Sequence, residues 1–154
     1  MSGGFSPAAV AAVLVACLTA SAFFSGAETG LMSISRIRLR SLMRREPDPR
    51  AAVLRRLLDR IEDPVLSCLI GTNLANVGFS AVLTAALTAR YGSRGEFAAA
   101  VIATVLMVVF GEIIPKVVYR EYPEMLSLAS VRPLRAAMLL LAPVRWVLLA
   151  YSSL

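Results

Sequence analysis

The segment Gly111-Glu112-Ile113-Ile114-Pro115-Lys116 places a carboxylate and a proline at the end of an apolar stretch. Residues 97–110 carry no charge, so we expect Glu112 to lie inside a lipid bilayer. An acid at that depth is costly unless it meets a cation, a polar partner or water, and it usually marks a functional site. Pro115 lacks a backbone N–H and would free a carbonyl one turn earlier, near Gly111. A carboxylate beside a free carbonyl predicts an oxygen site for a hard cation.

A second group of oxygen-bearing side chains lies in the apolar run near the N-terminus. Ser21, Ser25 and Glu28 are spaced i, i+4, i+7, so a helix would present them on one face. Gly26 and Gly30 form a small-xxx-small pair, which allows another helix to approach closely. The alternative for the serines is that each hydroxyl bonds to a carbonyl of its own helix.

A third polar stripe occurs in the next apolar run, at Asn73, Asn76, Ser80 and Thr84. Asparagine in hydrocarbon needs hydrogen-bond partners, so this face should point into a helix bundle or a wet cavity. We expect Asn73 to be the better ligand candidate. Asn76 suits a bond that holds two helices together at least as well as it suits ion binding.

These residues predict one site for Mg²⁺, Ca²⁺ or Na⁺, because all of their ligand atoms are oxygens. The expected ligands come from three apolar runs and are Ser21, Ser25, Asn73, Glu112 and a carbonyl such as that of Gly111. Around them we expect Asn76, Glu28, Pro115 and Lys116. Glu28 is either a second ion site or the partner of an arginine, and we favour the second. For Glu112 the alternative is a kinked helix in which it pairs with Lys116 or a polar neighbour.

Composition predicts an integral membrane protein. Hydrophobic residues make up 58% of the 154 positions, and the mean hydropathy is +0.72. Soluble domains are usually about 45–50% apolar. The net charge of +6 comes mainly from arginines beside apolar runs, which is typical of cytoplasmic loops and, without a reading motif, disfavours nucleic-acid binding. The chain has no histidine, and no base is placed to activate a nucleophile, so we do not expect an enzyme.

The apolar pattern predicts an all-α fold with three transmembrane helices at about 7–32, 64–89 and 96–118. The arginine-rich segment 33–63 should form a cytoplasmic helical hairpin, with an amphipathic helix after a turn at Glu46-Pro47-Asp48-Pro49. Residues 122–154 are interrupted by prolines and arginines and should form an inner juxtamembrane belt, although a fourth crossing stays open. The N-terminus is then outside and the C-terminus cytoplasmic. Ala20-Ser21-Ala22 resembles a signal cleavage site, but no basic segment precedes it, so we expect the first span to be retained.

Three motifs in this order resemble one family, the cyclin M/CorC membrane domain. The first is SAFFSGAETG at 21–30 followed by SRIRL at 35–39, the second is GTNLAN at 71–76, and the third is GEIIPK at 111–116. Each is weak alone, but together they cover nearly the whole chain. The resemblance implies a homodimeric Mg²⁺ transporter of the cell inner (plasma) membrane, with Mg²⁺ efflux coupled to Na⁺ entry. It also implies cytoplasmic CBS domains in the full-length protein; the sequence contains none, so we expect a membrane-domain fragment.

The expected mechanism is an inward-open cavity between three helices that ends at the Ser/Asn/Glu site. Glu112 would supply the charge that offsets loss of ion hydration, and the breaks at Ser25-Gly26 and Pro115 would let the helices shift. The rival interpretation is a membrane-embedded sensor or anchor that binds Mg²⁺ without moving it.

Overall fold

The computed structural model describes residues 6–35, 37, 39, 41 and 48–143, and the elements it describes are helices. Three of them are long and apolar enough to cross a bilayer. They are α1 (Pro7–Ser33), α4 (Glu62–Tyr91) and a continuous helix over Ser93–Glu121. The last consists of α5 (Ser93–Leu106), the π-helical segment η1 (Met107–Ile113) and α6 (Ile114–Glu121). Each helix extends beyond the span predicted for it.

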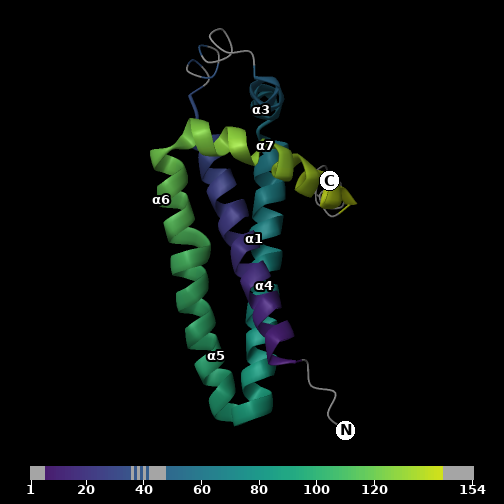
Figure 1. Cartoon of the computed structure of the whole chain (residues 1–154), viewed down its shortest axis with the longest axis vertical. Helices are drawn as coiled ribbons and strands as arrows, with labels where there is room; N and C mark the ends of the chain where they lie inside the picture. The colour runs from purple at the N-terminus through teal and green to yellow at the C-terminus, as the bar shows by residue number, and fades with distance from the viewer. Residues whose placement is uncertain (1–5, 36, 38, 40, 42–47, 144–154) are drawn as a thin grey trace, which may run out of the picture.

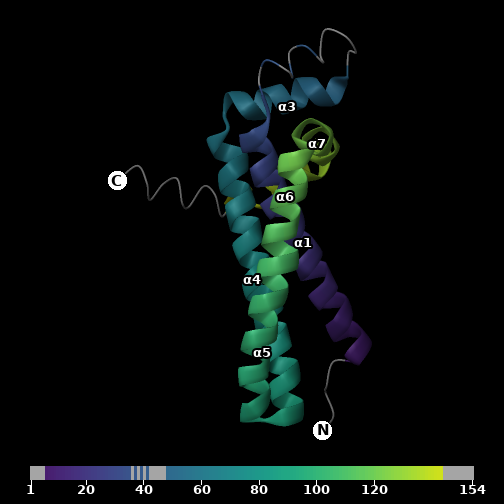
Figure 2. The same cartoon turned by 90° about the vertical axis from the view of Figure 1, so that its left-hand side faces the viewer.

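The chain signals the ends of these helices. The Ser6 hydroxyl accepts a hydrogen bond from the Ala9 N–H at 3.2 Å, and Pro7 opens α1, as suits a first helical turn. At the far end of the bundle, α4 turns directly into α5 at Gly92, whose φ of 61° a side chain would rarely permit. α4 and α5 therefore run antiparallel, while α1 crosses them and diverges toward its N-terminus (Figures 1 and 2).

Two shorter helices lie across the opposite end of the bundle, which we call the α3/α7 end (Figure 1). They are α3 (Pro49–Asp59) and α7 (Pro123–Leu140). α3 is the expected amphipathic helix, because Leu54 and Leu58 are buried while its arginines are exposed. α7 crosses the ends of the long helices within the predicted belt 122–154. Residues 42–47 of the predicted hairpin and residues 144–154 of the belt lie outside the described residues.

The larger apolar cluster lies at the α3/α7 end. Its buried members come from α1, α3, α4, α7 and the residues after α1: Ala27, Leu31, Ile34, Leu39, Ala51, Leu54, Leu58, Cys68, Val131 and Leu134. A smaller cluster of Phe79, Ala103 and Met107 lies between the long helices. Apolar packing against α1 and α4 therefore holds α3 and α7 across this end of the bundle.

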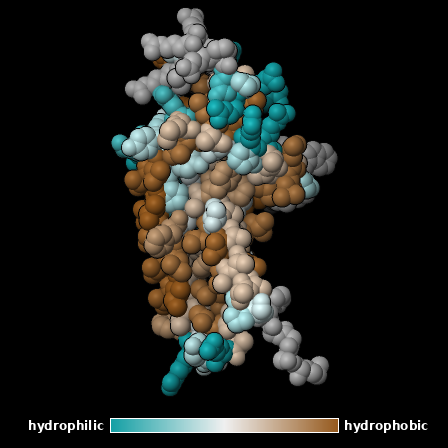
Figure 3. Space-filling view, in the orientation of Figure 1, coloured by the Kyte–Doolittle hydropathy of each residue, from teal (hydrophilic) through white to brown (hydrophobic). Residues whose placement is uncertain are grey.

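The outer surface of the long helices is apolar. Hydrophobic surface covers their middle in Figure 3, and hydrophilic residues gather at the two ends. Large side chains such as Val15, Phe97 and Val117 are 63%, 76% and 62% exposed. In a soluble protein this would be an unusually large apolar patch, whereas a bilayer covers such a belt. The chain is therefore a membrane protein.

Candidate functional site

One hydrogen-bonded chain joins the three long helices. The Ser21 hydroxyl of α1 donates to Asn76 Oδ1 of α4 at 2.7 Å. The Asn76 amide in turn donates from Nδ2 to Glu112 Oε1 of η1 at 3.0 Å. Ser21 and Asn76 are at the middle of their helices, so the contact is expected near the bilayer midplane, where carriers commonly bind substrates.

The π-helical segment η1 positions the acid of this chain. Its wider turns end at Ile114, whose N–H bonds to the Val109 carbonyl five residues earlier. Pro115 follows directly, so the proline irregularity takes the form of a π-helix. Gly111 is buried here, and its carbonyl O lies 3.5 Å from Ser21 Oγ. A Cβ on Gly111 would lie only 3.0 Å from that Oγ, so glycine permits the approach of α1.

Ser25 lies one helical turn from Ser21 and is fully buried. Its Oγ has no hydrogen-bond partner among the described residues. A buried hydroxyl without a partner is costly, which makes Ser25 Oγ available to an ion or a water molecule. Glu28, next along the predicted stripe, is half-buried and forms no ion pair within the described ranges. The predicted pairing of Glu28 with an arginine stays open here, because Arg36, Arg38, Arg40, Arg44 and Arg45 lie outside the described residues.

Two predicted residues stand apart from the contact. Asn73 is exposed and makes no side-chain hydrogen bond to any described residue, whereas Asn76 makes both side-chain contacts of the chain. Positions 73 and 76 are three residues apart on α4, so their side chains point in directions that differ by roughly 60° around the helix axis. Lys116 is exposed and forms no ion pair with Glu112. Within the described residues Glu112 does not pair with Lys116, and its polar neighbour is Asn76.

Tyr119 is a residue that the sequence did not single out. Its ring packs on α1, where a Cβ on Gly26 would lie 2.5 Å from Tyr119 Cδ2. The Tyr119 hydroxyl and Ser130 Oγ of α7 are 2.6 Å apart and share a hydrogen bond. Tyr119 thus links α1, α6 and α7 on the α3/α7 side of the site. The Gly26 and Gly30 pair had indicated a close neighbour, and Tyr119 is that neighbour.

A polar groove of about 790 Å³ continues from the site toward the turn between α4 and α5. Its polar lining consists of Asn76, Ser80, Thr84, Thr88 and Glu96. Ser80, Thr88 and Glu96 are exposed in the single chain. From Asn76 onward, the polar stripe predicted on this helix therefore lines an open groove, together with the small apolar side chains of Val77, Ala81 and Ala85.

The site is chemically suited to a hard cation. It offers one carboxylate, hydroxyl and amide oxygens and a backbone carbonyl, which are the ligand types of Mg²⁺ and Na⁺. The described residues contain no cluster of three or more His, Cys, Asp or Glu side chains. A soft or tightly caged metal is thus not what this donor set fits. A single carboxylate suits an ion that binds and leaves again.

Comparison with known proteins identifies the family. The model of the cyclin M transmembrane N-terminal domain matches residues 12–154. A UPF0053 protein of Haemophilus influenzae is 35% identical over 141 residues, which cover 92% of this chain and 33% of that protein. The UPF0053 inner membrane protein YfjD of Escherichia coli is 34% identical over 87% of this chain and 31% of its own length. A DUF21 domain-containing chloroplastic protein of Arabidopsis thaliana is 34% identical over 86% of this chain and 20% of its own.

The chain covers only part of the length of these relatives. The chain spans about a third of the length of the two bacterial relatives, so it corresponds to one part of them. The matched residues 12–154 contain most of the first span and both other spans, and Ser21, Asn76 and Glu112 lie within them. This chain belongs to the cyclin M transmembrane N-terminal domain family.

Proposed function

We propose that this chain forms the membrane pathway of a Mg²⁺ transporter, with Mg²⁺ efflux coupled to Na⁺ entry. The observation that carries the proposal is the contact of Ser21, Asn76 and Glu112, which brings three spans together around one carboxylate. An acid held inside a membrane bundle by neutral donors attracts a cation. We propose that Ser21, Ser25, Asn76, Glu112 and the Gly111 carbonyl hold the ion.

Ion hydration decides how such a site works. Mg²⁺ gives up its water reluctantly and usually keeps several waters when it is bound. The site offers too few charges to strip the ion completely, because Glu112 is its single carboxylate. We therefore expect Mg²⁺ to bind with part of its water shell, and Glu112 to offset the remaining loss of hydration. Na⁺ can drive transport only if it favours a different arrangement of the helices than Mg²⁺ does.

The irregular backbone supplies a place for that rearrangement. η1 holds Gly111 and Glu112 in π-helical turns, and π-helical segments are frequent at functional sites. A return of these residues toward α-helical geometry would rotate Glu112 relative to Asn76. The polar groove along Ser80, Thr84 and Thr88 would then carry the ion toward the other side of the membrane.

The same groove supports a homodimer. Polar side chains at bilayer depth need partners, and Ser80, Thr88 and Glu96 are exposed in the single chain. A second copy packed on this face would cover them.

The exposed arginines of α3 and α7 favour a cytoplasmic location for the α3/α7 end. The N-terminus would then lie outside, and the protein would reside in the inner (plasma) membrane.

The charge of Glu112 is the decisive test. Glu112→Gln keeps an acceptor oxygen for Asn76 but removes the charge, so the change leaves the helix contact intact. We expect Mg²⁺ flux into liposomes loaded with a Mg²⁺ indicator to fall by about tenfold or more, since a charged ligand is lost. Glu121→Gln, at the exposed end of α6, is the matched control and should transport normally. Undiminished flux in Glu112→Gln would refute the proposed role.

The second candidate is a sensor or anchor that binds Mg²⁺ and reports it to a partner. The Ser21–Asn76–Glu112 contact suits this function too, because binding alone could shift the helices. Purified protein that binds Mg²⁺ at Glu112 but shows no flux under any Mg²⁺ or Na⁺ gradient would favour the sensor.

A further inference from the structure

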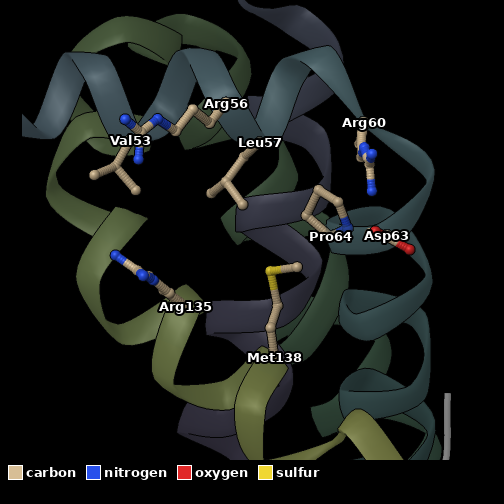
Figure 4. Close-up of a pocket in the computed structure, with 8 residues that line it drawn as sticks. All are labelled: Val53, Arg56, Leu57, Arg60, Asp63, Pro64, Arg135 and Met138. Carbon is tan, nitrogen blue, oxygen red and sulfur yellow. The ribbon is translucent and has the colours of Figure 1, made fainter. Parts of the chain in front are cut away.

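A hollow of about 250 Å³ lies at the α3/α7 end, away from the ion site. Its lining residues come from α3 and the residue that follows it, from the start of α4, and from α7. Figure 4 shows them around the hollow. Its lining residues are Val53, Arg56, Leu57, Arg60, Asp63, Pro64, Arg135 and Met138. This combination of arginines and apolar side chains has no role in the proposed ion pathway.

The hollow is positively charged. Arg56 and Arg135 approach it from the same side, although they belong to α3 and α7, and Arg60 lies at the opposite side near Asp63 (Figure 4). Three arginines face one aspartate, so the formal charge of the lining is positive. None of the three forms an ion pair with another residue in the described part of the chain. Guanidinium groups in such a setting bind phosphate well, because their fork of N–H donors fits its oxygens.

The rest of the lining is apolar and lies at the end of the candidate spans. Met138 points into the hollow from α7, with Leu57 of α3 on the opposite wall (Figure 4). Pro64 is in the first turn of α4, one of the candidate spans, so the hollow begins where the apolar part of the bundle begins. A ligand here would meet cationic groups at one end and apolar surface at the other.

We propose that this hollow binds one anionic phospholipid, with its phosphate between Arg56, Arg60 and Arg135 and its acyl chains along the apolar wall. Its volume lies below the roughly 300–1,000 Å³ of pockets for drug-sized ligands, which favours a headgroup over a nucleotide. A lipid bound there would tie α3 to α7. Because it binds only the folded arrangement, it would also raise thermal stability.

Paired variants on the same two helices test this site. Arg56→Gln with Arg135→Gln removes two lining charges. Arg55→Gln with Arg132→Gln removes two exposed charges from α3 and α7 that do not line the hollow. Retention of dioleoylphosphatidylglycerol by the purified full chain, measured by native mass spectrometry, should weaken by about tenfold in the first pair. The second pair should retain the lipid within about twofold of wild type, because it leaves the lining charges in place. Thermal stabilisation by the same lipid should be lost in the first pair only.

A third variant tests whether the lipid needs the open volume of the hollow as well as its charge. Met138→Trp fills the hollow and keeps all three arginines, and it should also release the lipid. Equal loss in both arginine pairs would overturn the proposal, because general surface charge would then explain binding. Equal retention of phosphatidylcholine would overturn the anionic requirement. Inorganic phosphate that stabilises the protein as much as the lipid does would assign the hollow to a free anion. None of these outcomes depends on Mg²⁺ transport, so the two proposals succeed or fail separately.

Discussion

Glu112 meets the amide of Asn76 and not the lysine on its own helix. Among the described residues no cation neutralises this carboxylate, and its hydrogen-bond partner is uncharged. A negative charge held in this way at mid-depth leaves room for a mobile cation to act as the counter-charge. Ser21 and the buried, unpartnered Ser25 supply the nearest additional oxygens on α1.

The two asparagines of α4 give a matched test of this site. Asn76→Ala removes the acceptor of Ser21 and the donor to Glu112, so we expect Mg²⁺ flux to fall by about tenfold, as for a lost hydrogen bond to a charged group. Asn73→Ala removes an exposed side chain without a hydrogen bond and should stay within about twofold. Flux of indicator-loaded liposomes measures both. A larger loss in Asn73→Ala than in Asn76→Ala would instead support Asn73 as the ligand, as the sequence predicts.

Sequence reasoning could predict most of this donor set but not the choice between the asparagines. Ser21, Ser25 and Glu112 stand out because polar groups inside apolar runs are rare. Asn73 and Asn76 share a polar stripe, and which of them faces Ser21 and Glu112 depends on how α4 is rotated about its axis relative to α1 and η1. That rotation is set by packing at glycines such as Gly71, where a Cβ would lie 2.5 Å from Phe24 Cδ2. Spacing along one helix does not contain that information.

At the scale of elements, the glycine pair of α1 fixes where the third span lies. Gly26 and Gly30 both meet the Tyr119 ring, and Gly30 also faces Ser127 Oγ, which a Cβ would approach to 2.6 Å. Tyr119 then bonds to Ser130. The two glycines therefore connect the third span and α7 to α1 through one aromatic side chain, one turn beyond Pro115.

We expect Gly26→Ala to lower thermal stability. The new methyl would overlap the Tyr119 ring, which must move and strain its bond to Ser130. Overpacking of this kind costs about 1–3 kcal/mol, or roughly 3–10 °C in Tm for a chain of this size. Gly78→Ala is the control, because its Cβ would lie 3.4 Å from Cys17 Sγ, an ordinary contact. Thermal unfolding in detergent compares the two, and equal Tm values would contradict the packing argument.

The elements themselves were predictable to different degrees. Uninterrupted apolar runs identified three spans. α1 begins where it was predicted to begin, whereas the other two spans extend by a few residues at both ends, because polar and charged residues that hydropathy leaves out still continue the helix. The proline at 115 indicated an irregular helix, but the π-helical form of η1 depends on the bond from Ile114 to Val109. The path of α7 across the bundle follows from its buried residues Val131 and Leu134, which no periodic signal distinguished.

For the whole molecule, the question is what covers the polar groove. A bilayer core disfavours exposed polar groups, yet Ser80, one turn from Asn76, lies open on α4, and Thr88 and Glu96 continue this polar lining to the turn at Gly92. Elsewhere the exposed side chains of the long helices are mostly apolar, such as Val15 on α1, with Asn73 of α4 as an exception. This asymmetry separates a face suited to protein from faces suited to lipid, and it favours a second copy over the groove.

Cysteine cross-linking in native membranes tests that arrangement. In a background with Cys17→Ala and Cys68→Ala, we expect Ser80→Cys and Thr88→Cys to give a species of doubled mass with a short bis-maleimide. Both positions line the groove, so a copy packed on it brings its own thiols within reach. Val15→Cys is the control, because its side chain is 63% exposed on the apolar surface of α1 and should face lipid. Efficient cross-linking through Val15→Cys, with none through the groove, would move the interface to α1 and leave the polar groove to water and ions.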